Sequence, residues 1–135
     1  MKRLPYLLVV ILALLLSSCG EAGPTTTINV TLMDFQFTPN QFTVPAGQEI
    51  TINVTNTGAV VHNFIIMKLG TTAGATYEEE DDANVYWGEK DIQPGGDLSV
   101  TFTAPTEPGE YEVVCRTEGH IASGMVGKLV VVAGE

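Results

Sequence analysis

The sequence GEYEVVCRTEGHIASGMVGKLVVV, residues 109–132, decides the fold. Both ends of this stretch are rich in Val, Tyr and Leu, which predicts two strands, at residues 111–115 and 128–132. Between these strands, Gly119 and Gly124 lie among the polar residues and permit tight backbone turns. The segment around these glycines begins with a cysteine, ends with a methionine and contains a histidine midway. The stretch therefore predicts two strands joined by a loop that carries metal-binding residue types.

Outward from this stretch, short apolar alternations bounded by Gly, Pro and Asn recur along the chain, and no segment has a helical period. This pattern predicts an all-β fold, a Greek-key antiparallel β-sandwich. Met33 and Met67 fall within or beside predicted strands and are expected in the core. Segment 70–94 shows no clear strand pattern, and connections of this length are uncommon unless they are functional. The remaining predicted strands lie at 28–32, 42–44, 50–54, 60–67 and 98–102.

The length and charge of the chain limit the function classes. The 135 residues suit a single domain, and 6 Lys and Arg against 16 Asp and Glu give a formal charge of −10. Nucleic acid is not an expected partner, because binding to its phosphates requires the opposite charge. A hydrophobic content of 44% argues against extensive disorder.

The first residues have the layout of an export signal. A cationic start precedes an almost unbroken apolar run, residues 4–16, which is short for a membrane span of about 20 residues. The following Leu-Ser-Ser-Cys-Gly resembles the lipobox of bacterial lipoproteins, which implies cleavage before Cys19 and its acylation. An ordinary signal peptide cut near Ser18, or a short transmembrane anchor, is the alternative. We therefore expect a lipoprotein signal peptide at 1–18, a tether at 19–26 and the folded domain at 27–135.

Cys115 is left as a single free thiol if Cys19 carries lipid, which excludes a disulfide within the chain. A buried structural thiol, a reactive group and a metal ligand are all compatible with this. The spacing Cys-x4-His-x4-Met places His120 and Met125 in the same loop, and a sandwich can bring His62 to the same pole. Two imidazoles, a thiolate and a thioether favour copper, whereas zinc sites rarely use Met and hard cations prefer oxygen ligands.

Three segments carry a resemblance to the cupredoxin family, which includes plastocyanin, azurin and the auracyanins. They are residues 37–47, the Val-His-Asn-Phe at 61–64, and residues 108–131. Glu118 stands where many relatives have proline, and Arg116 where they often have a small polar residue.

The resemblance implies one mononuclear copper ion held by four side chains. His62 and His120 bind through ring nitrogens, Cys115 binds through a short thiolate bond and Met125 binds axially. Asn63 is implied to pin the cysteine loop by hydrogen bonds, and the carbonyl of Val61 to approach the metal weakly.

The function implied is that of a one-electron carrier, a type 1 (blue) copper protein, with redox proteins such as a cytochrome or a membrane electron-transfer complex as partners. An enzyme is not expected, because the chain lacks the further histidines and the second loop cysteine that copper enzymes need. A copper carrier that uses the same ligands is the main alternative, and a metal-free sandwich is a third. The location implied is the outer face of a bacterial cytoplasmic membrane or the periplasm, with the protein held there by lipid.

Two surfaces are candidate partner contacts. One is an acidic run after an aromatic residue, which either is a solvated loop or attracts a cationic redox partner. The other is an apolar patch that we expect around the edge of His120, through which electrons would enter and leave. The acidic run consists of Tyr77, Glu78, Glu79, Glu80, Asp81 and Asp82, and the apolar patch of Val60, Ile121 and Ala122.

Overall fold

The computed structural model describes residues 23–134. The signal peptide, Cys19 and the first part of the tether lie outside these described residues. Among the described residues, no helix is both long and apolar enough to cross a membrane.

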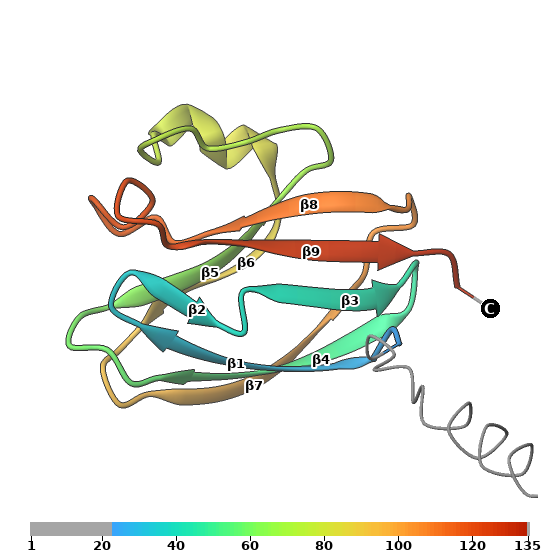
Figure 1. Ribbon diagram of the computed structural model, residues 1–135, viewed down its shortest axis with the longest axis horizontal. Coiled ribbons are helices and arrows are strands. Elements are labelled where there is room, and N and C mark those ends of the chain that lie inside the picture. Colours follow the sequence, from blue (N-terminus) through green and yellow to red (C-terminus); the bar gives the residue numbers. More distant parts are fainter. Residues whose placement is uncertain (1–22, 135) are drawn as a thin grey trace, which may run out of the picture.

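Two sheets pack face to face, which confirms the predicted β-sandwich (Figure 1). One sheet has four strands in the order β2-β1-β4-β7, and the other has five in the order β3-β9-β8-β5-β6. Their bounds are β1 Thr27–Met33, β2 Gln36–Thr38, β3 Gln41–Pro45, β4 Glu49–Asn56, β5 His62–Met67, β6 Val85–Ile92, β7 Asp97–Thr103, β8 Gly109–Val114 and β9 Val126–Val132.

Most strand pairs are antiparallel, as expected, but each sheet also contains one parallel pair. β1 runs parallel to β4, and β3 runs parallel to β9. These pairs join strands that are not connected by a hairpin, so the chain crosses between the sheets to form them.

The core is formed by the side chains that point inward from the strands, which alternate with outward-pointing ones. In β4 every second residue is buried, whereas all six residues of β5 are buried because this strand has neighbours on both edges and is covered on both faces. Phe64 lies at the centre, where Phe37 and Phe42 each meet its ring edge-on at 5.6 Å between centroids. Met67 is buried as expected, but the prediction for Met33 was wrong. Met33 is 44% exposed because it follows Leu32, whose side chain takes the inward position in β1.

Segment 70–94 is more regular than the sequence suggested. A 3₁₀ helix, Glu79–Asn84, leads into β6, which pairs with β5 at the edge of the sheet. The strand VYWGEKDI has no alternating apolar pattern and carries register shifts against β5, and an edge strand needs few apolar side chains. Trp87 of β6 stacks on Phe102 of β7, with 4.6 Å between ring centroids, and so links the two sheets.

The two poles of the sandwich have different contents (Figure 1). β1 begins, and β9 ends, at one pole. The loop from β8 to β9 lies at the opposite pole, together with the turn from β1 to β2. Residues that are distant in sequence therefore meet at the pole that holds the loop with Cys, His and Met.

Candidate metal centre

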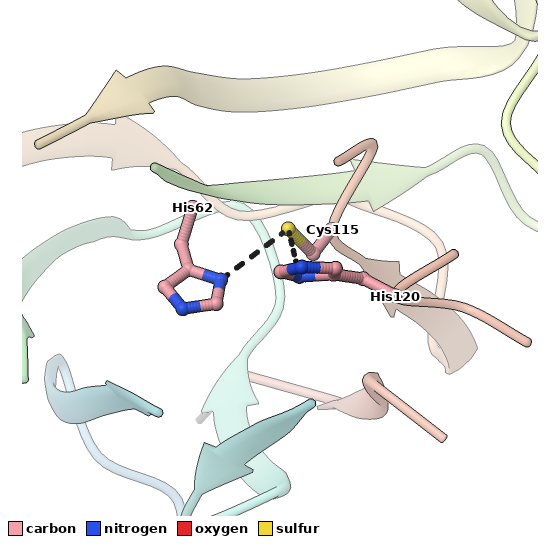
Figure 2. Close-up of side chains that lie close together, drawn as sticks. All are labelled: His62, Cys115 and His120. Carbon is pink, nitrogen blue, oxygen red and sulfur yellow. Dashed lines mark hydrogen bonds between the residues drawn. The ribbon is translucent and has the colours of Figure 1, made fainter. Parts of the chain in front are cut away.

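Three donor side chains converge at this pole. His62 is the first residue of β5, Cys115 directly follows β8, and His120 lies in the loop between β8 and β9. Their ligand atoms all lie within 4.8 Å of one another, and all three residues are buried. The Cys115 Sγ lies 3.8 Å from the Nδ1 of His62 and 3.6 Å from the Nδ1 of His120 (Figure 2). Both rings therefore turn the same nitrogen toward the sulfur.

The loop that carries Cys115, His120 and Met125 is folded on itself by backbone hydrogen bonds. The amide of His120 donates to the carbonyl of Thr117 at 3.0 Å, and the amide of Met125 donates to the carbonyl of His120 at 2.9 Å. Gly124 has a φ of 100°, which residues with a side chain rarely adopt. Met125 is fully buried and belongs to the same core cluster as Cys115.

The hydrogen bond made by His62 identifies its protonated nitrogen. Its Nε2 lies 3.3 Å from the Oδ1 of Asp34. A carboxylate offers only acceptors, so Nε2 is the donor in this contact, and Nδ1 is the nitrogen that faces Cys115. For His120, burial and then the nearby His62 lower the pKa of the imidazole. Both rings therefore present Nδ1 to the site, and the lowered pKa of His120 favours its neutral form.

Asn63 connects β5 to the cysteine loop. Its backbone amide lies 3.4 Å from the Cys115 Sγ, and its Nδ2 lies 3.8 Å from the same sulfur. The Nδ2 also donates to the Oγ1 of Thr117 at 3.1 Å, and Thr117 in turn donates to the carbonyl of Val61 at 2.9 Å. On its other side, the Oδ1 of Asn63 accepts from the amide of Asp91. The sulfur thus receives two contacts from N–H groups of one residue.

Phe35 is the apolar side chain that covers His120. His120 is 5% exposed, and the ring of Phe35 meets it edge-on with 5.2 Å between centroids. Val60 is 44% exposed and Ala122 is exposed, but the expectation for Ile121 was wrong, because its side chain is buried in a separate cluster with Met67 and Val114. The expectation of an apolar rim was incomplete, because Phe35, half-exposed and from the β1–β2 turn, lies directly against the histidine.

The acidic run forms the 3₁₀ helix and the residues before it. The Tyr77 hydroxyl donates to the Oδ1 of Asp82 at 2.7 Å, and the Nζ of Lys90 lies 3.5 Å from the same oxygen. Glu78 and Asp81 cap the helix by reciprocal bonds between side chain and backbone. A surface hollow of about 320 Å³ separates Tyr77 and Glu78 from the ligand loop. Much of the acidic charge is thus engaged in the structure of this segment.

Sequence reasoning missed Asp34, Phe35 and Thr117. The Asp-Phe pair has no turn-forming glycine or proline, and Phe35 adopts the left-handed backbone conformation with a φ of 65°. A short strand pair around Met-Asp-Phe-Gln was the available signal, but nothing in that pattern places the turn beside two histidines. Of the two unusual loop charges, Arg116 is paired, its Nη2 lying 3.5 Å from Asp91.

The donor set fits a copper ion. The buried thiol of Cys115 faces one nitrogen from each of two imidazole rings. The other nitrogen of the His62 ring contacts Asp34. A thiolate and two neutral imidazoles suit both copper(I) and copper(II), and the pattern matches the His₂Cys core of blue copper sites. Hard cations prefer oxygen ligands, and no carboxylate belongs to this three-residue group.

Comparison with known proteins agrees with this geometry. A family model described as a cupredoxin-like domain matches residues 6–131. Auracyanin-A of Chloroflexus aurantiacus is 32% identical, over 89% of this chain and 90% of the relative.

Two solved structures are also similar. Dithionite-reduced auracyanin from the photosynthetic bacterium Roseiflexus castenholzii is 33% identical with a TM-score of 0.71, over 82% of this chain and 99% of that one. Auracyanin A of Chloroflexus aurantiacus, described as a "blue" copper protein, is 32% identical with a TM-score of 0.64, over 82% of this chain and all of that one. The chain belongs to the cupredoxin-like domain family.

Proposed function

We propose that this protein is a mononuclear type 1 (blue) copper protein that carries one electron between redox partners. The observation that carries the proposal is the convergence of His62, Cys115 and His120, buried, with their ligand atoms within 4.8 Å. Met125, fully buried and in the same core cluster as Cys115, is proposed as a fourth residue that would hold the copper through its thioether. Bound copper supplies one-electron chemistry by alternating between its +1 and +2 states.

The chain contributes a rigid and dry site. β5 and the end of β8 are paired strands, so His62 and Cys115 are held by the sheet. Asn63 and Thr117 tie the loop to β5, which keeps the donor atoms in place whichever charge the site carries. Phe35 packs edge-on against His120, which is only 5% exposed. Electron transfer requires that the ligand atoms move little when the charge of the site changes, and this rigidity meets that requirement.

The visible spectrum and the voltammetry of the full chain in detergent test this function. After addition of copper(II), we expect an intense thiolate-to-copper charge-transfer band and a reversible one-electron couple. Cys115→Ser removes the thiolate and is expected to abolish the band, whereas Ser123→Ala, in the same loop but exposed, retains it. A colourless protein that binds only copper(I) would instead identify a copper carrier, and a protein that binds no copper would overturn both.

The proposed activity makes and breaks no covalent bond. The whole sequence has two histidines, and both belong to the one site, which leaves none for a second copper centre. The protein is therefore proposed to act as a carrier and not as an enzyme.

A lipid anchor on Cys19 is proposed for its cellular location. Support comes from the sequence alone, in the cationic start, the apolar run and the Leu-Ser-Ser-Cys-Gly motif. On this proposal the tether at 19–26 holds the domain at 27–135 to the outer face of a bacterial cytoplasmic membrane or in the periplasm. Labelled fatty acid should be incorporated into the wild type, while Cys19→Ser should lose the label and appear in the soluble fraction. Label retained in that variant would contradict the anchor.

The acidic run is proposed to attract a cationic redox protein, such as a cytochrome or a membrane electron-transfer complex. Glu79 and Glu80 are exposed, and among the described residues neither has a side-chain hydrogen bond or an ion pair. These two carboxylates are therefore the ones available to a partner. Ala122, which is exposed, is proposed to belong to the apolar contact over His120.

A further inference from the structure

The turn between β1 and β2 contacts both histidines from outside the ligand loop. Phe35 lies edge-on against His120, and the side chain of Asp34 reaches the Nε2 of His62. This turn belongs to the four-stranded sheet, whereas His62 belongs to the five-stranded one. Asp34 is thus a contact between the two sheets at the metal-binding pole.

The Asp34 carboxylate is held in place independently of the histidine. The backbone amide of Ala59 donates to its Oδ1 at 3.0 Å, the same oxygen that lies 3.3 Å from His62 Nε2. One oxygen therefore joins the β1–β2 turn, the loop before β5 and the buried imidazole.

Gly58 provides the space for this contact. A Cβ built at Gly58 would lie 2.5 Å from the Asp34 Oδ1 and 2.5 Å from the His62 Nε2, far inside van der Waals distance. The buried ring has little room to move, whereas Asp34 is 43% exposed and its side chain can swing out. A glycine at this position keeps the carboxylate and the imidazole within hydrogen-bonding distance.

We propose that Asp34 is a positioning residue, which orients the His62 ring and favours the oxidised state of the copper site. This inference rests on the proposed copper function. The hydrogen bond keeps the proton on Nε2 and thereby leaves Nδ1 free to bind. A thiolate with copper(II) carries a net charge of +1 and with copper(I) a net charge of zero, so a carboxylate beside the ring stabilises the oxidised form more.

Four variants of the full chain separate charge from hydrogen bonding. Asp34→Asn keeps an acceptor oxygen and removes the charge, while Asp34→Ala removes both. Gly58→Ala puts a Cβ against both groups, so it is expected to disturb the Asp34 side chain and the His62 ring together. Glu49→Gln, an exposed charge removal at the far end of β4, is the matched control.

The reduction potential is the first readout. Water screens the partly exposed Asp34, so we expect its effect on the preference for copper(II) over copper(I) to be about tenfold at most. A tenfold loss in the preference for copper(II) over copper(I) raises the potential by about 59 mV. We expect a rise of up to this size in Asp34→Asn and Asp34→Ala, and no comparable change in Glu49→Gln. An Asp34→Asn potential equal to that of Glu49→Gln would overturn the charge effect.

The ring nitrogens of His62 are the second readout, measured by ¹⁵N NMR of the metal-free chain. We expect the proton on Nε2 in the wild type and in Asp34→Asn, and a mixture of tautomers in Asp34→Ala and Gly58→Ala. A wild-type proton on Nδ1, or an unchanged tautomer in Asp34→Ala, would overturn the positioning role. Failure of the wild type to form a copper–thiolate band would refute the proposed function, and the NMR result would still decide how Asp34 positions the ring.

Discussion

Asn63 shows how one buried residue links a strand to a loop. Its amide side chain bonds Thr117 on one side and the backbone of Asp91 on the other, and its Nδ2 also approaches the Cys115 sulfur. Only a short side chain with both a donor and an acceptor satisfies these neighbours. The residue therefore contributes to stability even without metal.

Asn63→Ala is expected to destabilise the metal-free protein by about 1–3 kcal/mol, because it leaves buried polar groups without partners. Urea unfolding followed by circular dichroism measures this. Asn29→Ala is the matched control, since Asn29 is exposed and its bond to Asn53 is exposed as well, and a loss below about 0.5 kcal/mol is expected there. Equal losses in the two variants would contradict the structural role of Asn63.

The spacing of Cys115, His120 and Met125 indicated the metal site, because donor type and loop length are properties of the local sequence. Asp34 could not be predicted in the same way. Its role depends on the packing of one sheet's turn against another sheet's first residue, and no local pattern encodes that distance.

At the scale of elements, β6 was the strand that the sequence pattern did not predict. Alternation reveals a strand when one face is buried and the other is wet, and β6 is an edge strand whose exposed residues do not alternate. Its position is fixed by pairing with β5 and by the stacking of Trp87 on Phe102. The other strands could be predicted because their inward residues form the core.

Trp87→Ala is expected to lower the free energy of unfolding by about 3 kcal/mol, since it removes a large ring stacked between the sheets. Trp87→Phe should lose less, because it keeps an aromatic ring over Phe102. Circular dichroism follows the urea transition of each variant, since the single Trp of the chain is itself replaced. A loss near zero in Trp87→Ala would mean that β6 is held by its backbone alone.

Three tyrosines, one of them beside the acidic helix, are expected to make the folded state less stable as the pH rises above about 10. Burial, followed by the hydrogen bond to Asp82, raises the pKa of Tyr77 above its usual value, and burial also raises the pKa values of Tyr86 and Tyr111. The folded state therefore keeps these phenols protonated where the unfolded chain has lost the proton. Their contribution to stability is complete below about pH 10, the unfolded pKa, and declines as the pH rises beyond it.

Tyr77→Phe should accordingly reduce the decline in stability between pH 9 and pH 11. The free energy of unfolding of the metal-free protein, measured at each pH, gives the slope. The neighbouring change Thr76→Val, which leaves all phenols in place, serves as the control. Identical slopes in Tyr77→Phe and wild type would show that the tyrosine is ionised equally in the folded and unfolded states.

At the scale of the whole molecule, the formal charge of −10 attracts cationic partners before they make contact. Opposite charge on a partner accelerates encounter, and salt removes this effect because the screening length is about 10 Å at 0.1 M. The engaged acids Glu78, Asp81 and Asp82 maintain the helix, and Glu79 and Glu80 project from it.

Replacing Glu79 and Glu80 by Gln should slow electron transfer with a cationic cytochrome severalfold at low salt, with the difference vanishing at high salt. Stopped-flow rates against ionic strength provide the measurement. The control replaces Glu49 and Glu107, two exposed acids at the other pole, and should change the rate less. Equal effects of both double variants would mean that net charge alone steers the partner.

The poles of the sandwich also set the direction in which the site faces. β1 begins at the pole opposite the ligand loop, and its seven residues span about 23 Å. If Cys19 carries lipid, the attachment point lies at the chain end that leads into β1, at the pole opposite the proposed copper site. The redox end of the domain then lies away from the attachment point, so soluble partners reach it without competing with the membrane. An integral membrane partner must extend above the lipid surface to reach it.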